Sequence, residues 1–379
     1  MIIYADDNMP LAHEFFSALG DVRRFDGRTA TAAALQDADV LLVRSVTRVN
    51  AALLANNQRL QFVGTATIGT DHLDCNYLTA RGVPFTNAAG CNAQSVLEYV
   101  LSCLWLYCEQ AGRPLAGLCI GVVGCGQIGH RLVRALQLLG CEVLQSDPPR
   151  ARLEPDFVDT PLDDLLRQAD VISLHVPLIK SGPDQTVHLL DAARLARLAP
   201  TKALINACRG EVVDNQALLQ QAQAGCRRPL FLDVWEGEPL IEQRLLPYCT
   251  IATAHIAGHS IEGKVRGTEM LYQALCRQLN VPVRLAMADF LPAAGIHSVT
   301  LSGAPTETEL KQLSRLLYDV RRDDLLLRQQ LASAGFDWLR KHYPPRREFS
   351  ALQVSGPDVA LLHALGFARA SDTSRAQEK

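Results

Sequence analysis

The order of apolar and polar positions predicts two successive parallel sheets. In the first hundred residues, short apolar runs alternate with helical patterns, which is typical of parallel strands joined by helices. These runs lie at residues 1–4, 40–43, 62–63 and 83–85, with a helical pattern at 13–19. A second series begins at residue 118, with apolar runs at 119–123, 142–144, 171–174, 203–205, 230–232 and 250–252. This second series predicts a complete doubly wound domain.

Two long helical patterns flank the second series, at residues 93–110 and 261–278. Because the later helix leads back from the second series, we expect the second domain to be inserted in a discontinuous first domain. Beyond about residue 286 the pattern changes to short strands and helices. The predicted fold class is α/β, with two doubly wound parallel-sheet domains, the inserted one of Rossmann type, and a small C-terminal α+β domain. The predicted boundaries are 1–95 with 256–285, then 96–255, then 286–379.

Composition and charge narrow the possible partners. Lys and Arg number 37 against 40 Asp and Glu, a net charge of −3, so the chain lacks the positive surplus that favours nucleic acid binding. The most apolar stretch, 100–108, is far shorter than the roughly 20 residues of a membrane-spanning helix. The 11 cysteines show neither a C-x-x-C pair nor a metal-ligand spacing. We expect no nucleic acid, membrane or metal partner, and reduced thiols in the cytoplasm.

A glycine-rich turn follows the first strand of the second series. The sequence Gly124-Cys-Gly126-Gln-Ile-Gly129 leads from that strand directly into a helix. In this context the first glycine permits a tight turn, the second admits a pyrophosphate, and the third lets helix and strand pack closely. The helix N-terminus then offers N–H groups and a positive dipole to phosphates. The turn predicts a dinucleotide site.

An acidic residue completes this fingerprint. Asp147 stands at the end of the next predicted strand, where it would accept hydrogen bonds from ribose hydroxyls and repel a 2′-phosphate. It favours NAD over NADP, although Arg150 keeps NADP open. S-adenosylmethionine, which uses a similar turn and acid, and a purely structural turn are the alternatives.

Three later strand ends carry polar groups that a structural role alone would not demand. They are Asn206-Ala-Cys-Arg209-Gly210, Asp233-Val-Trp-Glu-Gly-Glu238-Pro239 and Thr253-Ala-His255. Ligands of open parallel sheets bind beyond the carboxyl ends of the strands, so these segments should line one crevice. Oxidation of an alcohol needs a base, for which His255 is the candidate, with Glu238 on its other ring nitrogen and Arg209 on a substrate carboxylate. Taken singly, each residue could equally be structural.

These motifs resemble the D-isomer-specific 2-hydroxyacid dehydrogenase family over residues 1–282. Further motifs are similar to the branch that acts on a phosphorylated four-carbon substrate in vitamin B6 synthesis; they are Val43-Arg-Ser-Val-Thr47, Gly64-Thr-Ala-Thr67, Gly69-Thr-Asp-His72, Gly90-Cys-Asn92 and Tyr318-Asp-Val-Arg-Arg-Asp-Asp324. The resemblance implies NAD-linked oxidation of 4-phospho-D-erythronate by a cytoplasmic homodimer. It makes residues 1–95 with 256–285 the substrate domain, 96–255 the NAD domain and 286–379 the dimerisation domain.

The resemblance also implies roles for individual residues. Arg209, Glu238 and His255 would be catalytic. The cofactor contacts would be Gly124, Gly126, Gln127, Ile128, Gly129, Asp147, Val176, Ala207, Cys208, Arg209, Asp233 and Gly258. The substrate contacts would be Ser45, Thr67 and Arg44, with His259 where the family carries a tyrosine. Arg346 and Arg347 are further candidates for the substrate phosphate, reaching across a dimer.

Two alternative functions remain open from the sequence. The first is a D-3-phosphoglycerate dehydrogenase, whose substrate also has a carboxylate, a 2-hydroxyl and a terminal phosphate. The second is an NAD-sensing, corepressor-like binding protein of the same fold, without catalysis.

Overall fold

The computed structural model describes residues 1–370, so residues 371–379 of the predicted C-terminal domain lie outside the described part. The chain forms two compact units. Unit 1 comprises Met1–Asn92 and Ser260–Pro292, and unit 2 comprises Ala93–His259 and the chain from Ala293 onward. The domain boundaries predicted from the sequence stay a prediction. Among the described residues, no helix is both long and apolar enough to cross a membrane.

Unit 1 is built on a five-stranded parallel sheet in the order β2-β1-β3-β4-β5. Its strands are β1 (Ile2–Asp6), β2 (Asp21–Phe25), β3 (Val40–Val43), β4 (Phe62–Thr65) and β5 (Phe85–Asn87). Its helices are α1 (Ala12–Phe16), α2 (Cys75–Ala80) and α9 (Ile261–Gln278), with a 3-10 turn at Met287–Asp289. Both faces are covered, because Val40 and Leu42 of β3 pack in one core and Leu41 and Val43 in another.

Unit 2 contains a six-stranded parallel sheet in the order β11-β10-β9-β8-β6-β7. The strands are β6 (Cys119–Val123), β7 (Glu142–Ser146), β8 (Val171–Leu174), β9 (Ala203–Asn206), β10 (Leu230–Leu232) and β11 (Ile251–Ala252). The helices around it are α3 (Ala93–Ala111), α4 (Gln127–Leu138), α5 (Pro148–Leu153), α6 (Leu162–Gln168), α7 (Ala192–Arg197) and α8 (Asn215–Gln223), with 3-10 turns at Gly210–Val212 and Gln243–Tyr248. The chain order along the sheet changes direction at β6 and β8, which is the switch point where ligands bind in such folds.

The C-terminal part of unit 2 adds a three-stranded parallel sheet and four helices. The strands are β12 (Ser298–Thr300), β13 (Gln353–Ser355) and β14 (Ala368–Arg369). The helices are α10 (Glu307–Leu317), α11 (Val320–Ala334), α12 (Phe336–Lys341) and α13 (Ala360–Leu365), with a 3-10 turn at Phe349–Ala351. The two large parallel sheets and the small third sheet confirm the predicted fold class.

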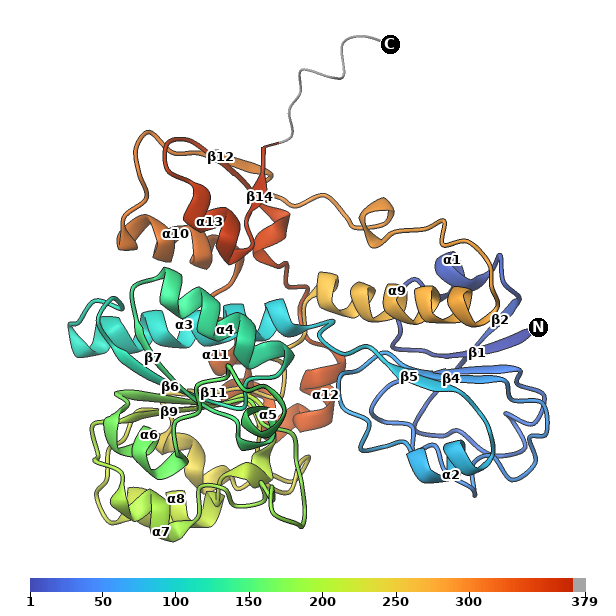
Figure 1. Ribbon diagram of the computed structural model, residues 1–379, viewed down its shortest axis with the longest axis horizontal. Coiled ribbons are helices and arrows are strands. Elements are labelled where there is room, and N and C mark those ends of the chain that lie inside the picture. The colour runs from blue at the N-terminus through green and yellow to red at the C-terminus, as the bar shows by residue number, and fades with distance from the viewer. Residues whose placement is uncertain (371–379) are drawn as a thin grey trace. The chain divides into compact units, whose positions relative to one another are not determined.

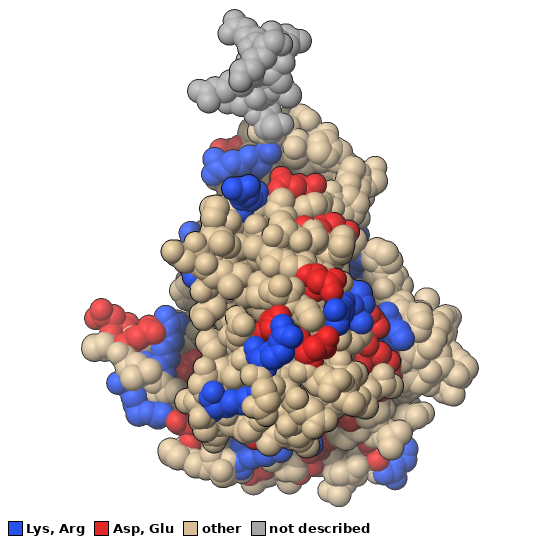
Figure 2. Space-filling model, turned by 90° about the vertical axis from the view of Figure 1, so that its right-hand side faces the viewer, with Lys and Arg blue, Asp and Glu red and all other residues tan. Residues whose placement is uncertain are grey.

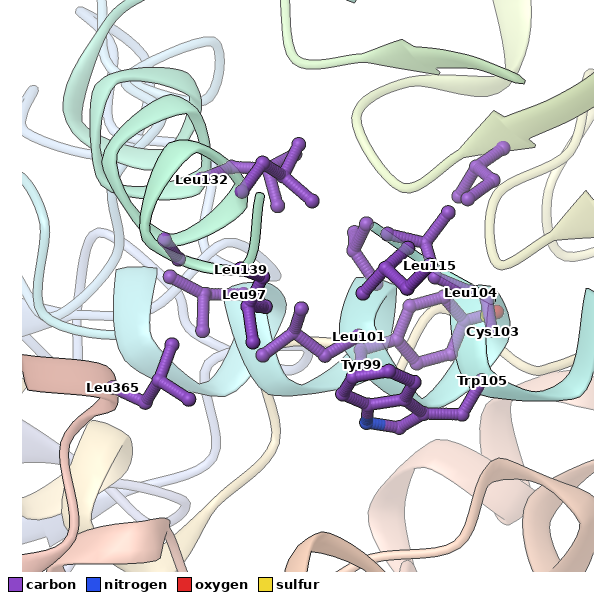
Figure 3. Packing of buried hydrophobic residues seen from close by; sticks show 14 of the residues in the cluster. Leu97, Tyr99, Leu101, Cys103, Leu104, Trp105, Leu115, Leu132, Leu139 and Leu365 are labelled. Atoms are coloured by element: carbon purple, nitrogen blue, oxygen red, sulfur yellow. The ribbon is translucent and has the colours of Figure 1, made fainter. Parts of the chain in front are cut away.

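Helix α3 is the central element of the largest core of unit 2 (Figure 1). Its sequence pattern predicts one apolar face, but Leu97, Tyr99, Leu101, Cys103 and Trp105 are all buried. Figure 3 shows these side chains around the helix, with Leu132 and Leu139 of the α4 region on one side and Leu365 of α13 on the other. The helix is buried on all sides because α4 and the C-terminal segment both pack against it.

Surface charges are mixed, as the near-zero net charge suggests. On the face shown in Figure 2, Lys and Arg side chains are interleaved with Asp and Glu. Ion pairs of the described residues include Arg23 with Asp37 at 2.6 Å.

Candidate active site

The glycine-rich turn has the three properties that its sequence predicts. Gly124 has φ +88°, and a Cβ there would lie 2.7 Å from the carbonyl carbon of His175, at the end of the neighbouring strand. A Cβ on Gly126 would meet nothing within 4 Å, so the turn is open there. A Cβ on Gly129 would collide with the carbonyl oxygen of Gly124, so helix α4 starts in close contact with the turn. This open, N–H-rich turn fits a dinucleotide pyrophosphate.

Asp147 directly follows β7 and joins this turn. One carboxylate oxygen accepts from the backbone N–H of Cys125 at 2.7 Å, and the other accepts from the N–H of Arg150 at 3.1 Å and caps α5. The Arg150 side chain donates to the carbonyl of Cys125 and pairs with Glu154. Since Arg150 is held by these two groups, the arrangement favours a ribose hydroxyl beside Asp147, as in NAD, over a 2′-phosphate.

Two other predicted cofactor residues lie beside the switch point. Val176 follows β8, and its backbone interacts with the thiol of Cys208, which follows β9. The Asn206 carboxamide accepts from the Cys208 N–H at 3.2 Å and donates to the carbonyl of Arg209 at 3.0 Å. Burial raises the pKa of the Cys208 thiol to about 11, so this cysteine stays protonated and acts in packing.

The structure brings His255 and Glu238 together. His255 Nδ1 lies 2.8 Å from Glu238 Oε2, and the two side chains are 31% and 19% exposed. The other carboxylate oxygen of Glu238 accepts from the N–H of Trp235 at 3.0 Å. Burial favours the neutral acid, but the hydrogen bond and charge of His255, the Trp235 N–H and the charge of Arg340 outweigh it and lower the pKa of Glu238 below its ordinary value. Glu238 is therefore an ionised partner that fixes the imidazole.

Arg209 lies at the same edge of the sheet, after the neighbouring strand β9. The next residue, Gly210, packs so closely on the Trp235–Glu236 peptide that a Cβ would collide with it. The loop that carries Glu238 is thereby held against the turn that carries Arg209. An Nη1 hydrogen bond of 2.8 Å to the carbonyl of Cys208 orients the guanidinium. Arginine, acid and imidazole thus come from adjacent strand ends.

The sequence predicts a cofactor contact for Asp233, whereas in the structure its carboxylate binds groups of the chain after β11. Its buried carboxylate accepts from the N–H groups of Ile256 and Ala257, at 2.8 and 3.0 Å, and from the Thr253 hydroxyl at 2.6 Å. Burial raises the pKa of Asp233, and the nearby His255 charge and these donors partly offset that effect. Asp233 thereby holds the loop that follows His255; its cofactor contact stays a prediction.

The predicted substrate residues divide between the units. Arg44 and Ser45 follow β3, and Thr67 lies just beyond β4, the adjacent strand of unit 1. The Thr67 hydroxyl bonds to Thr65 Oγ1 at 2.8 Å and to the carbonyl of Gly69 at 3.0 Å. His259 belongs to unit 2, where its ring lies 5.8 Å from that of Tyr343.

One hypothesis from the sequence is wrong. Arg346 does not present a free cation to a neighbouring subunit, because its side chain is buried in its own chain and binds backbone carbonyls there. The sequence Pro344-Pro-Arg-Arg-Glu348 looks like exposed surface and carries no signal of this burial.

A second cluster of titratable groups in unit 2 consists of His188, Asp214 and Glu236. His188 Nε2 lies 2.5 Å from Glu236, whose other oxygen accepts from the Asn215 N–H. Asp214 caps helix α8. Each carboxylate accepts a hydrogen bond from a backbone N–H, so the cluster stabilises the local fold.

Comparison with known proteins shows the family of the chain. Residues 94–257 match the NAD binding domain of the D-isomer specific 2-hydroxyacid dehydrogenases, and residues 290–366 match a domain of unknown function. The D-lactate dehydrogenase of Aquifex aeolicus, solved with NAD and lactic acid, is similar with a TM-score of 0.62 and 25% identity, covering 74% of this chain and 96% of its own.

Two curated relatives match nearly the whole chain. The erythronate-4-phosphate dehydrogenase of Pseudoalteromonas translucida is 49% identical over 97% of this chain and 99% of its own length. The enzyme of that name from Aeromonas hydrophila is 50% identical over 97% and 99%. The chain therefore belongs to the erythronate-4-phosphate dehydrogenases, within the D-isomer specific 2-hydroxyacid dehydrogenase family.

Proposed function

We propose that this protein oxidises the C2 hydroxyl of 4-phospho-D-erythronate with NAD, giving (R)-3-hydroxy-2-oxo-4-phosphooxybutanoate for pyridoxine 5′-phosphate synthesis. The observation that carries the proposal is the 2.8 Å pair of His255 and Glu238, in a chain about half identical to enzymes of that name. NAD, when bound, accepts the hydride that leaves C2. The protein must supply the base, the carboxylate clamp and the binding sites.

His255 acts as the base. Glu238 occupies Nδ1, so Nε2 is the nitrogen that takes the proton of the C2 hydroxyl. The ionised carboxylate stabilises the imidazolium that forms, and it gives the ring one tautomer before reaction. The same pair returns the proton in the reverse direction.

Arg209 binds the substrate carboxylate. A planar guanidinium matches a carboxylate in two parallel hydrogen bonds, which fixes C2 and polarises the oxygen that becomes the ketone. The contact of Gly210 with the Trp235–Glu236 peptide supports this role, because it sets the position of Arg209 relative to the loop of Glu238.

The cofactor residues are those of the switch point. The pyrophosphate binds at Gly124, Gly126 and the first turn of α4, with Gln127, Ile128 and Gly129, and the ribose hydroxyls bind Asp147. The remaining contacts are Val176, Ala207, Cys208, Arg209, Asp233 and Gly258. The open space at Gly126 and the position of Asp147 support this assignment.

The substrate phosphate binds cations and hydroxyls of unit 1, namely Arg44, Ser45 and Thr67, and His259 is a further substrate contact. Lys264 joins this group. Helix α9 approaches the β3 and β4 ends closely, since a Cβ on Gly267 would lie 3.2 Å from the carbonyl oxygen of Ala66, and Lys264 is one turn earlier. Burial and the charge of Arg44 lower the pKa of Lys264 to about 8, which an anion beside both cations would relieve.

The enzyme acts as a homodimer in the cytoplasm. The dimer is what the resemblance of the sequence motifs to this family implies. The cysteines form no disulfide, and burial raises the pKa of Cys108, Cys125 and Cys141 to about 12, which suits a reducing compartment. Light scattering of the purified protein tests the dimer directly.

The test of the function is turnover. The purified protein is mixed with NAD, 4-phospho-D-erythronate and a 2-oxo acid as second acceptor. We expect it to convert 4-phospho-D-erythronate to the 2-oxo product, and mass spectrometry would detect that product. 3-Phospho-D-glycerate should react far more slowly. Faster turnover of 3-phospho-D-glycerate would make the protein a phosphoglycerate dehydrogenase, and tight NAD binding without turnover of either acid would favour a sensor.

A further inference from the structure

Arg346 lies between helix α3 and the loop that follows His255. The residue is 1% exposed, although it comes from the segment between α12 and β13. Its Nη1 donates to the carbonyl of Ala257 at 3.1 Å, and its Nη2 donates to the carbonyl of Ser95 at 2.7 Å. One side chain therefore links the C-terminal segment, α3 and the active-site loop.

The surroundings of Arg346 are arranged for a buried cation. The guanidinium carbon lies 3.5 Å from the ring centroid of Tyr318, and Nη2 lies 3.6 Å from Glu98 Oε2. Glu98 also accepts from the N–H of Phe349 at 2.7 Å. A buried charge is tolerated only with such partners, so the position of Arg346 is closely determined.

The loop that Arg346 contacts needs support. His255 has φ +55°, a left-handed conformation that costs a residue with a side chain about 1–2 kcal/mol. Asp233 holds the N–H groups of Ile256 and Ala257 on one side. Arg346 holds the carbonyl of Ala257 on the other side. The backbone after His255 is thus held through its N–H groups by Asp233 and through a carbonyl by Arg346.

The same C-terminal segment also contacts the chain before His255. Asp324 of α11 accepts from the N–H of Ala252, in β11, at 2.8 Å. Leu327 of α11 and Leu339 of α12 pack in one core with Ala254, and Figure 1 shows α11 beside β11. The segment therefore holds the backbone on both sides of the histidine.

From these contacts we infer that Arg346 is a positioning residue for the reaction: by binding the Ala257 carbonyl it keeps His255 in the orientation that faces Glu238. The inference rests on the proposed function of His255 as the base. It gives the domain of unknown function at residues 290–366 a role in the active site of its own chain.

The experiment compares two variants of the full chain. Arg346→Lys keeps the charge but cannot hold two carbonyls in the same fork. The double variant Arg346→Met with Glu98→Gln removes the buried cation together with the acid 3.6 Å from it, so that no ionisable Glu98 is left without its partner. Because small displacements of reacting groups cost up to about 100-fold in rate, we expect kcat to fall about 10- to 100-fold in both variants. KM for NAD should change little, and the acid limb of the pH–rate profile should shift.

Amide exchange gives a readout that does not depend on turnover. The N–H groups of Ile256 and Ala257 should exchange with deuterium faster in both variants than in the wild type. The matched control is Arg315→Met. It breaks a different ion pair of the C-terminal segment with α3, the one between Arg315 of α10 and Glu109. The control should leave kcat and the exchange of residues 256–257 unchanged.

The outcomes separate the inference from the proposed function. A double variant with wild-type kcat, pH profile and amide exchange would overturn the positioning role. If the wild type fails to oxidise 4-phospho-D-erythronate, the proposed function fails, and unchanged amide exchange in the variants would then overturn the inference on its own.

Discussion

The carboxylate of Glu238 acts on the proposed base through a single hydrogen bond. Glu238→Gln keeps the shape but removes the negative charge that stabilises the imidazolium. We expect kcat to fall about 100-fold, a common loss for impaired proton transfer, with NAD affinity nearly unchanged. Steady-state kinetics and a separate NAD titration would measure the two quantities.

A nearby acid supplies the control for this prediction. Glu242 lies four residues further along the same chain segment and pairs with Arg244 at 2.6 Å. Glu242→Gln should leave the rate and its pH profile as in the wild type. A Glu238→Gln variant with the kcat of the wild type would show that the carboxylate does not support the proposed base.

The charge of Lys264 should affect substrate binding in a pH-dependent way. Burial and the Arg44 charge lower its pKa to about 8, so the ammonium is lost as the pH rises through that value. KM for 4-phospho-D-erythronate should therefore rise above pH 8. Lys264→Gln should raise KM by about 10- to 100-fold near neutral pH, in line with a charged hydrogen bond, and should abolish this pH dependence.

Steady-state kinetics across pH would measure this effect. Arg277→Gln, an exposed change at the other end of α9, is the control and should leave KM unchanged. A Lys264→Gln variant that lowers kcat while KM stays constant would contradict a role in phosphate binding.

The role of a residue could be predicted from the sequence when its place in a strand or turn decides its neighbours, and could not when its neighbours are remote in sequence. His255, Glu238 and Asp147 stand at strand ends, and the rule for parallel sheets places strand ends together. Arg346 binds the carbonyl of Ala257, and the charge of Arg44 acts on Lys264, so both effects come from residues remote in sequence. No local pattern encodes such interactions, so the sequence alone gives Arg346 the wrong role and does not single out Lys264.

At the scale of elements, the strands buried on both faces were the predictable ones. The all-apolar run of β3, and the run of β8 in which only Ser173 is polar, read directly as strands. Strand β2, with the sequence Asp-Val-Arg-Arg-Phe, is missed because it is a partly exposed edge strand that pairs only with β1. Helix α11 is missed because charged residues dominate its first turns, and its burial comes from packing beside β11.

Two glycines of the glycine-rich turn allow the effect of a substitution on NAD affinity to be distinguished from its effect on protein stability. Gly126→Ala adds a methyl group where the structure is open, so the melting temperature should stay constant while NAD affinity falls. Gly129→Ala places a Cβ against the Gly124 carbonyl, and such overpacking typically costs about 1–3 kcal/mol. Its melting temperature should fall even without NAD.

Thermal unfolding without NAD and titration with NAD would test the pair. Each variant is the control for the other, because both add one methyl group to the same turn. Equal losses of melting temperature in the two variants would contradict the open space at Gly126.

At the scale of the whole molecule, α3 joins the sheet and the C-terminal segment of unit 2. Residues of α4, α10 and α13 pack in the same core with it, so the C-terminal segment shares a core with the Rossmann-type sheet. The sequence shows the change of pattern near residue 286 but not this shared core. Burial on every face of α3 also removes one of its acids, Glu98, from solvent.

Two acids of α3 should make stability depend on pH in opposite directions. Burial raises the pKa of Glu98 to about 8, although Arg346 opposes the shift, so its contribution is complete below the ordinary pKa of 4.5 and is lost as the pH rises through 8. The hydrogen bond from Arg315 lowers the pKa of Glu109, so its contribution exists above the ordinary value and is lost in acid.

Glutamine variants of the two acids test this linkage. Because glutamine resembles a protonated acid, Glu98→Gln should match the wild type below the ordinary pKa of 4.5 and be more stable near pH 9. Glu109→Gln, the matched change on the same helix, should be less stable than the wild type at neutral pH by under about 1 kcal/mol. Urea unfolding midpoints at several pH values would measure both. A Glu98→Gln variant that is less stable than the wild type near pH 9 would mean that Arg346 holds Glu98 ionised, and that the buried pair is charged throughout.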